Sequence, residues 1–164
     1  NNAGYEQVCP SYELTEEIWD TIMETNLKGA FFAAQFAAHS MVRSSRGGAI
    51  VNVCSLTSYV GVPTAVPYGS SKSGLLGMTR ALSTEWASEQ IRVNAIAPGY
   101  FRTELTEAFY REQAWQEAML QKIPLNSFGN ANDLKGAVVF LVSDAAKSIT
   151  GHSVAIDGGQ LASI

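Results

Sequence analysis

The sequence has few cysteines, few charged residues and no long apolar run. Its two cysteines, Cys9 and Cys54, form neither a disulfide framework nor a metal-ligand spacing, and they predict free thiols in a reducing compartment. No apolar stretch approaches the roughly 18–20 residues that span a bilayer, and no signal peptide opens the chain. The 11 basic residues are outnumbered by 15 acidic ones, giving a net charge of −4, which argues against a nucleic-acid surface. We therefore expect a cytoplasmic protein that binds neither membranes nor nucleic acids.

The composition that remains is typical of a globular chain. Hydrophobic residues make up 46% of the sequence and charged residues 16%, a balance that favours a packed core over disorder. A length of 164 residues fits one domain, and the chain contains no repeat, low-complexity stretch or linker. We expect residues 1–164 to form a single domain.

Helical and strand patterns alternate along the chain. Thr15 and the two glutamates after it indicate a helix start, and apolar residues then recur at helical spacing to about Val42. Pro67 suits the first turn of a second long helix, which continues to about Ser88. Short apolar runs typical of buried parallel strands occupy residues 49–54, 91–97 and 153–156, and further helical patterns lie within residues 103–122 and 134–142. This alternation predicts an α/β fold with a mostly parallel sheet covered by helices.

Three polar residues can form a proton-transfer site. Tyr68 and Lys72 are four residues apart at the start of the second long helix, so their side chains share a face. A free phenol, with a pKa of about 10, is a poor base at neutral pH, and an ammonium group nearby lowers that pKa because it stabilises the phenolate. Ser55 follows the first strand, at the edge where open α/β sheets bind ligands. Tyr68 is thus a candidate proton shuttle, and the Ser55 hydroxyl a candidate partner of the substrate oxygen.

Several of the notable residues also have a purely structural interpretation. Tyrosine–lysine pairs at this spacing arise often by chance on solvated helix faces. Asn26 continues the apolar i+4 series of the first helix, where its amide is either a satisfied core group or a partly exposed one. Cys54 belongs to an apolar strand and is expected to be a buried thiol. His39 and His152 lack metal-ligand spacing, so the sequence predicts no metal site.

Together the motifs resemble those of the short-chain dehydrogenase/reductase family along the whole chain. Residues 68–72, Tyr-Gly-Ser-Ser-Lys, resemble its YxxxK motif, and Ser55 precedes Tyr68 by thirteen residues, the spacing usual for the family's catalytic serine. Residues 1–4, Asn-Asn-Ala-Gly, resemble its NNAG motif, and residues 157–159, Asp-Gly-Gly, resemble the end of its closing strand. The resemblance implies a Rossmann-like doubly wound parallel sheet and a nicotinamide-dependent oxidoreductase. Its implied catalytic residues are Asn26, Ser55, Tyr68 and Lys72, among which Asn26 holds a water in a proton relay to the lysine.

The resemblance also implies NAD or NADP as the cofactor. The implied cofactor-binding residues are Asn2, Ala3, Gly4, Tyr68, Lys72, Pro98, Gly99, Phe101 and Thr103. The family's glycine-rich turn, TGxxxGxG, and the residue that distinguishes NAD from NADP are not among the 164 residues. Because that turn lets a helix N-terminus approach the pyrophosphate, we expect a fragment that lacks the first strands of the sheet. Such a fragment is expected to bind the cofactor weakly and to show little turnover on its own.

Two segments bear on the substrate. Residues 97–105 and 157–164 look similar to gluconate 5-dehydrogenases and related sugar-acid dehydrogenases, which implies a sugar acid or polyol. Arg102 is either a partner of a substrate carboxylate or a surface arginine, and residues 103–122 are either a substrate lid or a surface helical hairpin. A 3-oxoacyl-carrier-protein-reductase-like enzyme and a non-catalytic assembly module stand as alternative functions.

The assembly state is a further implication of the resemblance. Members of the family are usually tetramers that pack their long helices, here residues 15–45 and 66–90, against their copies. We therefore expect a homo-oligomer, either a dimer or a tetramer. The aromatic residues Phe31, Phe32 and Phe36 are expected to be core or subunit contact.

Overall fold

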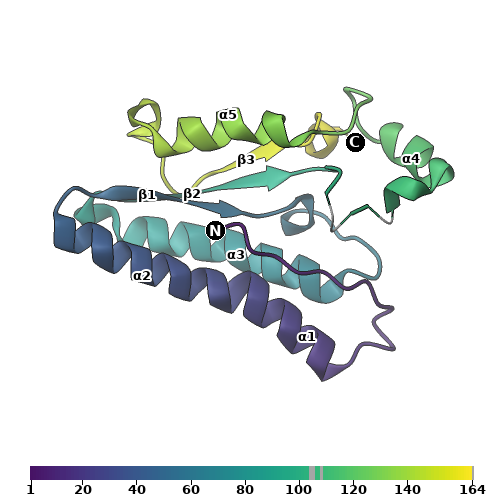
Figure 1. The fold of residues 1–164 in the computed structure, drawn as a ribbon, viewed down its shortest axis with the longest axis horizontal. Coiled ribbons are helices and arrows are strands. Elements are labelled where there is room, and N and C mark those ends of the chain that lie inside the picture. The colour runs from purple at the N-terminus through teal and green to yellow at the C-terminus, as the bar shows by residue number, and fades with distance from the viewer. Residues whose placement is uncertain (104–105, 108, 164) are drawn as a thin grey trace.

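A parallel three-stranded sheet lies at the centre of the computed structural model, which describes residues 1–103, 106–107 and 109–163 (Figure 1). The strands β1 (Gly48–Val53), β2 (Ile91–Pro98) and β3 (Ser153–Ile156) lie in the order β1-β2-β3. Ile50 of β1 pairs with Val93 of β2, and β2 pairs in turn with β3. The predicted parallel sheet is confirmed, and each strand lies within one residue of its predicted bounds.

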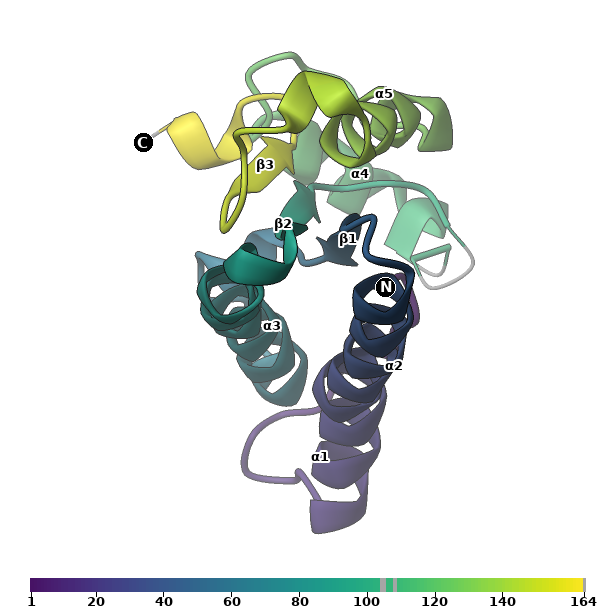
Figure 2. The ribbon, with the colours of Figure 1, turned by 90° about the vertical axis from the view of Figure 1, so that its left-hand side faces the viewer.

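Helices cover both faces of this sheet (Figure 2). On one face lie α1 (Glu16–Met23), α2 (Gly29–Ser44) and α3 (Val66–Glu85), and on the other lies α5 (Ala131–Val142). The short helix α4 (Gln113–Leu120) lies beyond the carboxyl ends of the strands (Figure 1). A parallel sheet with helices on both faces is the doubly wound, Rossmann-like arrangement that the resemblance implied.

The first predicted helix follows one path but is not one α-helix. The Thr15 side chain caps its start by accepting a hydrogen bond from the Ile18 N–H at 3.3 Å. Between α1 and α2, Glu24–Lys28 form a π turn, in which the Gly29 N–H donates to the Glu24 carbonyl. Asn26 lies inside this turn and is fully buried. Single π turns within α-helices often occur at functional sites, and apolar periodicity alone does not reveal them.

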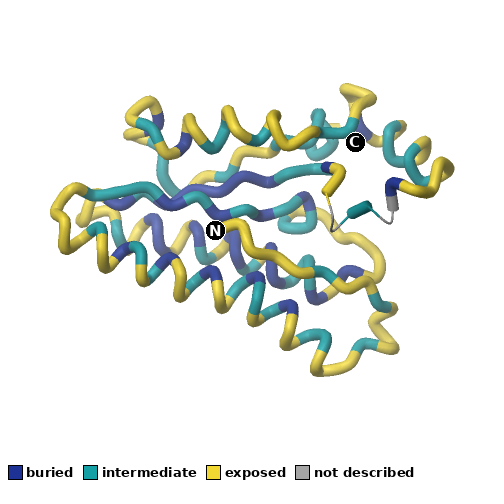
Figure 3. The backbone as a smooth tube through the Cα atoms, in the orientation of Figure 1, coloured by how far each residue is buried: buried dark blue, intermediate teal, exposed yellow. Residues whose placement is uncertain are grey.

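The core lies between the sheet and the helix pair α2 and α3. Alanines at every fourth position of α2 bring that helix close to the sheet: Ala30, Ala34 and Ala38. Leucines of α3 fill the other side of this layer: Leu75, Leu76 and Leu82. Figure 3 shows the dark blue of buried residues running along β2, the middle strand of the sheet. This packed core therefore holds the carboxyl ends of β1 and β2 in fixed positions.

Two expectations about these elements are wrong in detail, and a third stays a prediction in part. Phe31 packs against the core, whereas Phe32 and Phe36 are 54% and 76% exposed on the face of α2 opposite its buried alanines, so for these two residues subunit contact stays a prediction. The two helices predicted within residues 103–122 are one α-helix, α4, and a 3₁₀ turn at Phe109–Arg111. The helix α3 ends at Glu85, before a 3₁₀ turn at Ala87–Glu89.

Some of the predicted segments are covered only in part. Residues 104, 105, 108 and 164, which belong to the expected lid and to the two substrate-related segments, lie outside the described residues. Within the part of the chain that the structure describes, no helix is both long and apolar enough to cross a membrane.

Candidate active site

The candidate residues gather at the carboxyl edge of the sheet, where open α/β folds bind ligands. Ser55 comes two residues after β1, Gly99 directly after β2, and Tyr68 lies in the first turn of α3. All three line a cavity of about 480 Å³. The Cys54 N–H donates to the Ile96 carbonyl at 2.8 Å, which extends the pairing of the two strands up to Ser55.

Ser55 and Tyr68 line this cavity together. The neighbouring Ser55 hydroxyl acts to lower the pKa of the Tyr68 phenol. The Ser55 side chain also accepts a hydrogen bond from the Thr57 N–H at 3.2 Å, as the N-cap of a short 3₁₀ turn at Leu56–Ser58. The cap fixes the serine hydroxyl where the strand ends. The spacing of thirteen residues thus brings serine and tyrosine together in space.

The pKa of Tyr68 is shifted in the direction opposite to the one expected from the sequence. Burial, followed by the nearby Glu6 carboxylate, raises the pKa of Tyr68 to about 12. The Lys72 ammonium lies 5.6 Å from the centre of the Tyr68 ring and donates its hydrogen bond to the Val53 carbonyl, at 2.7 Å. The expected lowering of the Tyr68 pKa is therefore not found in the structure, because burial disfavours the phenolate more strongly than its neighbours stabilise it.

Lys72 is itself a buried base. Its side chain is 3% exposed, and burial lowers the pKa of its ammonium group, while Cys54 and Glu6 act in the opposite direction. The alternative of a chance tyrosine–lysine pair on a solvated helix face is excluded by this burial. Among the described residues its ammonium has one hydrogen-bond acceptor, the Val53 carbonyl, so its other N–H donors can serve a neighbouring ligand.

Of the two alternatives for Asn26, a hydrogen-bonded core residue or a partly exposed one, the structure shows the first. Its Oδ1 accepts a hydrogen bond from the Tyr5 N–H at 2.7 Å, and its Nδ2 donates to the Tyr5 carbonyl at 2.9 Å and to the Ser71 hydroxyl at 3.1 Å. Both N–H groups of the amide are thereby used, and one lone pair of Oδ1 is left. The side chain holds the loop after Gly4, and its role in a proton relay stays a prediction.

The first residue of the chain lies beside β1, an outer strand of the sheet. Asn1 pairs with β1, since the Val53 N–H donates to the Asn1 carbonyl at 2.9 Å and the Asn1 amino group to the Val51 carbonyl at 2.9 Å. The backbone of residues 2–4 is exposed. A side chain at Gly4 would place its Cβ 3.6 Å from Lys72 Nζ, so glycine leaves the space beside the ammonium open.

The segment after β2 is only partly at the cavity. Gly99 lines it, and its N–H donates to the Ile156 carbonyl at 2.9 Å. Pro98 is the last residue of β2. Phe101 is 7% exposed and forms a bridge with Gly129, whereas Thr103 is exposed. Neither of these last two lines the cavity, and their cofactor contacts stay predictions.

Some residues of the cavity wall were not singled out as site residues from the sequence. Among them, Glu6, Tyr100 and Trp115 line it together with Tyr68. The rings of Tyr100 and Trp115 meet edge to face, with their centroids 5.4 Å apart. No pattern in the sequence singles out Glu6, because it lies in an irregular loop whose position depends on Asn26. Trp115 belongs to the segment expected to be a lid.

The remaining candidate residues lie in surroundings that indicate no catalytic or binding role. Cys54 is 2% exposed, as expected of a buried thiol, and burial raises its pKa. His39 and His152 are exposed, and no group of histidine, cysteine and acidic residues that could hold a metal occurs in the described ranges. Arg102 is an exposed arginine whose guanidinium binds both carboxylate oxygens of Glu107, at 2.8 and 2.7 Å.

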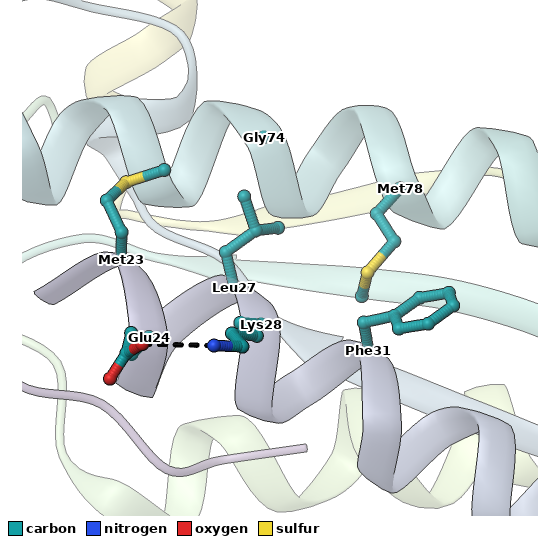
Figure 4. Close-up of a pocket in the computed structure, with 7 residues that line it drawn as sticks. All are labelled: Met23, Glu24, Leu27, Lys28, Phe31, Gly74 and Met78. Carbon is teal, nitrogen blue, oxygen red and sulfur yellow. Dashed lines mark hydrogen bonds and ion pairs between the residues drawn. The ribbon is translucent and has the colours of Figure 1, made fainter. Parts of the chain in front are cut away.

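A second groove lies between the first helices and α3 (Figure 4). Its lining is mostly apolar and comprises Met23, Glu24, Leu27, Lys28, Phe31, Gly74 and Met78. Its two charged side chains, Glu24 and Lys28, pair with each other at 3.0 Å on the exposed rim. This groove offers packing surface and no reactive group.

Comparison with known proteins places this geometry among dehydrogenases and reductases. A family model described as enoyl-(acyl carrier protein) reductase matches residues 1–160. The 2-dehydro-3-deoxy-D-gluconate 5-dehydrogenase of Escherichia coli (strain K12) is 40% identical over 162 residues, which are 99% of this chain and 64% of that protein. A 3-oxoacyl-[acyl-carrier-protein] reductase of Staphylococcus aureus (strain Mu50 / ATCC 700699) is 41% identical over 160 residues, 98% of this chain and 64% of that protein.

Solved structures are equally similar in fold. A protein of Sinorhizobium meliloti 1021, provisionally assigned as a short-chain alcohol dehydrogenase, has a TM-score of 0.96 at 64% identity. A gluconate 5-dehydrogenase from Burkholderia cenocepacia J2315, in complex with NADP and tartrate, has a TM-score of 0.97 at 32% identity. Each match covers 99% of this chain and 64% of the other. The chain thus spans 64% of the length of these relatives.

Proposed function

Because the chain belongs to the short-chain dehydrogenase/reductase family, we propose that its protein is an NAD(P)-dependent oxidoreductase that interconverts a secondary alcohol and a ketone. Residues 1–164 are then one catalytic and substrate-binding domain. The observation that carries the proposal is that Tyr68 lies with Ser55 at the wall of a cavity of about 480 Å³ and one helical turn from the buried Lys72 ammonium.

The surroundings of the cavity fit a nicotinamide nucleotide. Within the described residues the Lys72 ammonium makes one hydrogen bond, so two of its N–H donors are available, and the bare Gly4 leaves room beside them. Thr57 Oγ1 and Gln160 Oε1, on residues that line the cavity, are buried with no partner among the described residues. Lys72, the backbone of residues 2–4 and the turn at residues 98–99 would hold the nucleotide. When bound, NADH or NADPH supplies the hydride.

Tyr68 and Ser55 supply the proton chemistry. In reduction, the carbonyl carbon of the substrate accepts a hydride and its oxygen accepts the Tyr68 proton, so that a ketone and NAD(P)H give a secondary alcohol and NAD(P)⁺. The Ser55 hydroxyl donates a hydrogen bond to the same oxygen and polarises the carbonyl. With its pKa raised to about 12, the phenol keeps its proton at neutral pH and is ready to act as the acid. The Lys72 ammonium stabilises the phenolate that is left.

The substrate we favour is a sugar acid or a polyol. Relatives named as dehydrogenases of gluconate and deoxygluconate support this choice, and so do the polar groups Glu6, Thr57 and Gln160 at the cavity. A 3-oxoacyl-carrier-protein-reductase-like activity is the second candidate, favoured by the Staphylococcus aureus relative. A non-catalytic assembly module is disfavoured by the convergence of Ser55 and Tyr68 on one cavity.

Replacement of Tyr68 tests the proposal. The natural protein that carries these residues is assayed with NADH and NADPH against 5-keto-D-gluconate and against an acetoacetyl thioester. We expect Tyr68→Phe to lower kcat/KM about 10²–10⁴-fold while nicotinamide fluorescence reports unchanged cofactor binding. Wild-type protein that reduces neither substrate, or a Tyr68→Phe variant of full activity, would overturn the proposal. The 164-residue chain alone is expected to bind the cofactor weakly and to turn over little.

We also propose a homo-oligomer in the cytoplasm, either a dimer or a tetramer. The exposed rings of Phe32 and Phe36 on α2 lie on a long helix that the family resemblance assigns to subunit contact. Free thiols at Cys9 and Cys54 suit a reducing compartment.

A further inference from the structure

Glu6 occupies a defined place at the wall of the candidate active site. It follows Tyr5, whose N–H and carbonyl are both held by the buried Asn26 side chain, at 2.7 and 2.9 Å. It lines the same cavity as Ser55 and Tyr68. A residue beside such a doubly held backbone has little freedom to leave the cavity, so its carboxylate belongs to the site.

The Glu6 carboxylate has no protein partner there. Within the described ranges it makes neither a hydrogen bond nor an ion pair, although it is only partly exposed. Its charge reaches the proposed proton donor and the cavity wall, because it contributes to raising the pKa of both Tyr68 and Tyr100. Burial raises the pKa of Glu6 itself, and the Lys72 charge opposes that shift. A half-buried acceptor without a partner loses hydration, which a ligand that donates a hydrogen bond restores.

Another part of the cavity wall is aromatic, in contrast to the charged Glu6. Tyr100 and Trp115 line the cavity with an edge-to-face aromatic pair. Aromatic faces bind apolar C–H surface, and a carboxylate binds hydroxyl groups. A polyhydroxylated carbon chain offers both, whereas an acyl chain offers only the first. Lys122, exposed and also on the cavity wall, is the cation that a substrate carboxylate would meet.

We propose that Glu6 is a specificity-determining residue, which accepts a hydrogen bond from a substrate hydroxyl close to the reacting carbonyl. It thereby selects polyhydroxylated ketones over acyl chains, and it repels a substrate carboxylate, so that the carboxylate of a sugar acid lies at the Lys122 end. This inference rests on the proposed oxidoreductase function and names its substrate class.

Two substrates that differ in hydroxyl groups alone test the role of Glu6. 5-Keto-D-gluconate and 5-oxohexanoate are both six-carbon acids with a ketone at C5, but the second carries no hydroxyl group. For the wild-type natural protein we expect kcat/KM to favour 5-keto-D-gluconate at least about 100-fold, because a site built to bind hydroxyl groups discriminates strongly against their absence. Glu6→Leu should reduce that ratio at least about tenfold, while kcat/KM for 5-oxohexanoate stays equal or rises.

Matched variants keep the test decisive. Glu13→Gln removes an exposed carboxylate of the same N-terminal segment that does not line the cavity, and it should leave the ratio unchanged. Glu6→Gln, nearly isosteric, replaces Glu6→Leu should the latter fail to fold, and it should lower the ratio to a smaller extent. A ratio that stays the same in the Glu6 variants of an active protein overturns the role of Glu6 alone. A wild-type protein that reduces the acetoacetyl thioester but neither ketone overturns the role of Glu6 and leaves the oxidoreductase function standing, and one that reduces none of the three overturns both.

Discussion

The Asn26 amide and the Tyr5 backbone form a two-bond clamp, in which the amide oxygen accepts from the Tyr5 N–H and the amide nitrogen donates to the Tyr5 carbonyl. The Asn26 side chain, which comes from the π turn, thus makes the pair of backbone hydrogen bonds that a neighbouring strand would otherwise make. The clamp fixes the loop that carries both Gly4 and Glu6, and with it one wall of the cavity. Asn26 therefore acts on the site through the loop that it positions.

Removal of the clamp should cost both stability and activity. Asn26→Leu deletes three hydrogen bonds, and we expect the free energy of unfolding to fall by about 2–4 kcal/mol. Ser71→Ala deletes the bond between Asn26 and Ser71 and the bond from the Ser71 hydroxyl to the Tyr68 carbonyl within α3, but neither bond to Tyr5, so it should cost about 1–2 kcal/mol and leave the loop in place. Urea unfolding and kcat/KM are measured for both variants. An Asn26→Leu variant with wild-type kcat/KM would show that the loop does not depend on Asn26.

Tyr68 should make folding stability fall in alkali. Its pKa is 10.0 in the unfolded reference and about 12 in the folded protein, chiefly because of burial. Below pH 10 the Tyr68 phenol keeps its proton in both the folded and the unfolded state, and its contribution to the free energy of unfolding is complete. Between pH 10 and 12 the phenol ionises in the unfolded chain but not in the folded protein, so the free energy of unfolding falls. Two pKa units correspond to about 2.7 kcal/mol.

The measurement compares wild type with Tyr68→Phe in urea at pH 9 and pH 11.5. Between the two pH values, the free energy of unfolding of the variant should fall by about 2 kcal/mol less than that of the wild type. Tyr110, whose pKa is also raised to about 12, is present in both proteins and cancels in the comparison. Equal losses in the two proteins would contradict the raised pKa of Tyr68.

Arg102 should have little influence on substrate binding. Its guanidinium is already bound to Glu107 on the surface, and the residue does not line the cavity. We expect Arg102→Ala to change the KM for a sugar acid within about twofold and Lys122→Ala to raise it up to about fivefold, the range of an exposed ion pair. The reverse order of the two effects would restore Arg102 as the carboxylate partner.

The exposed aromatic face of α2 should govern assembly. Phe36→Ser removes a ring that is 76% exposed, and we expect light scattering to show a smaller assembly than for the wild type, because burial of such rings drives association. Tyr12→Ser, which removes a fully exposed ring outside the long helices, is the control and should leave the mass unchanged. A monomeric wild-type protein would contradict the expected oligomer.

Local patterns in the sequence were sufficient for the elements and for part of the site. The i, i+4 spacing of Tyr68 and Lys72 and the position of Ser55 after a strand predict neighbours, since both relationships follow from regular secondary structure. The π turn at Asn26 and the loop around Glu6 could not be predicted in the same way. Their conformation is set by contacts between residues 21 positions apart, as in the pair of Tyr5 and Asn26.

The sequence by itself determined the α/β alternation, the strands within one residue and the candidate residues for proton transfer, because periodicity and motif spacing are local properties. Only the tertiary structure decided the sign of the Tyr68 pKa shift, since burial of the phenol outweighs the charges around it. It also decided that Arg102 faces Glu107 and that Glu6 faces the cavity. The physical reason is that burial and the convergence of loops at a sheet edge arise from packing between distant segments.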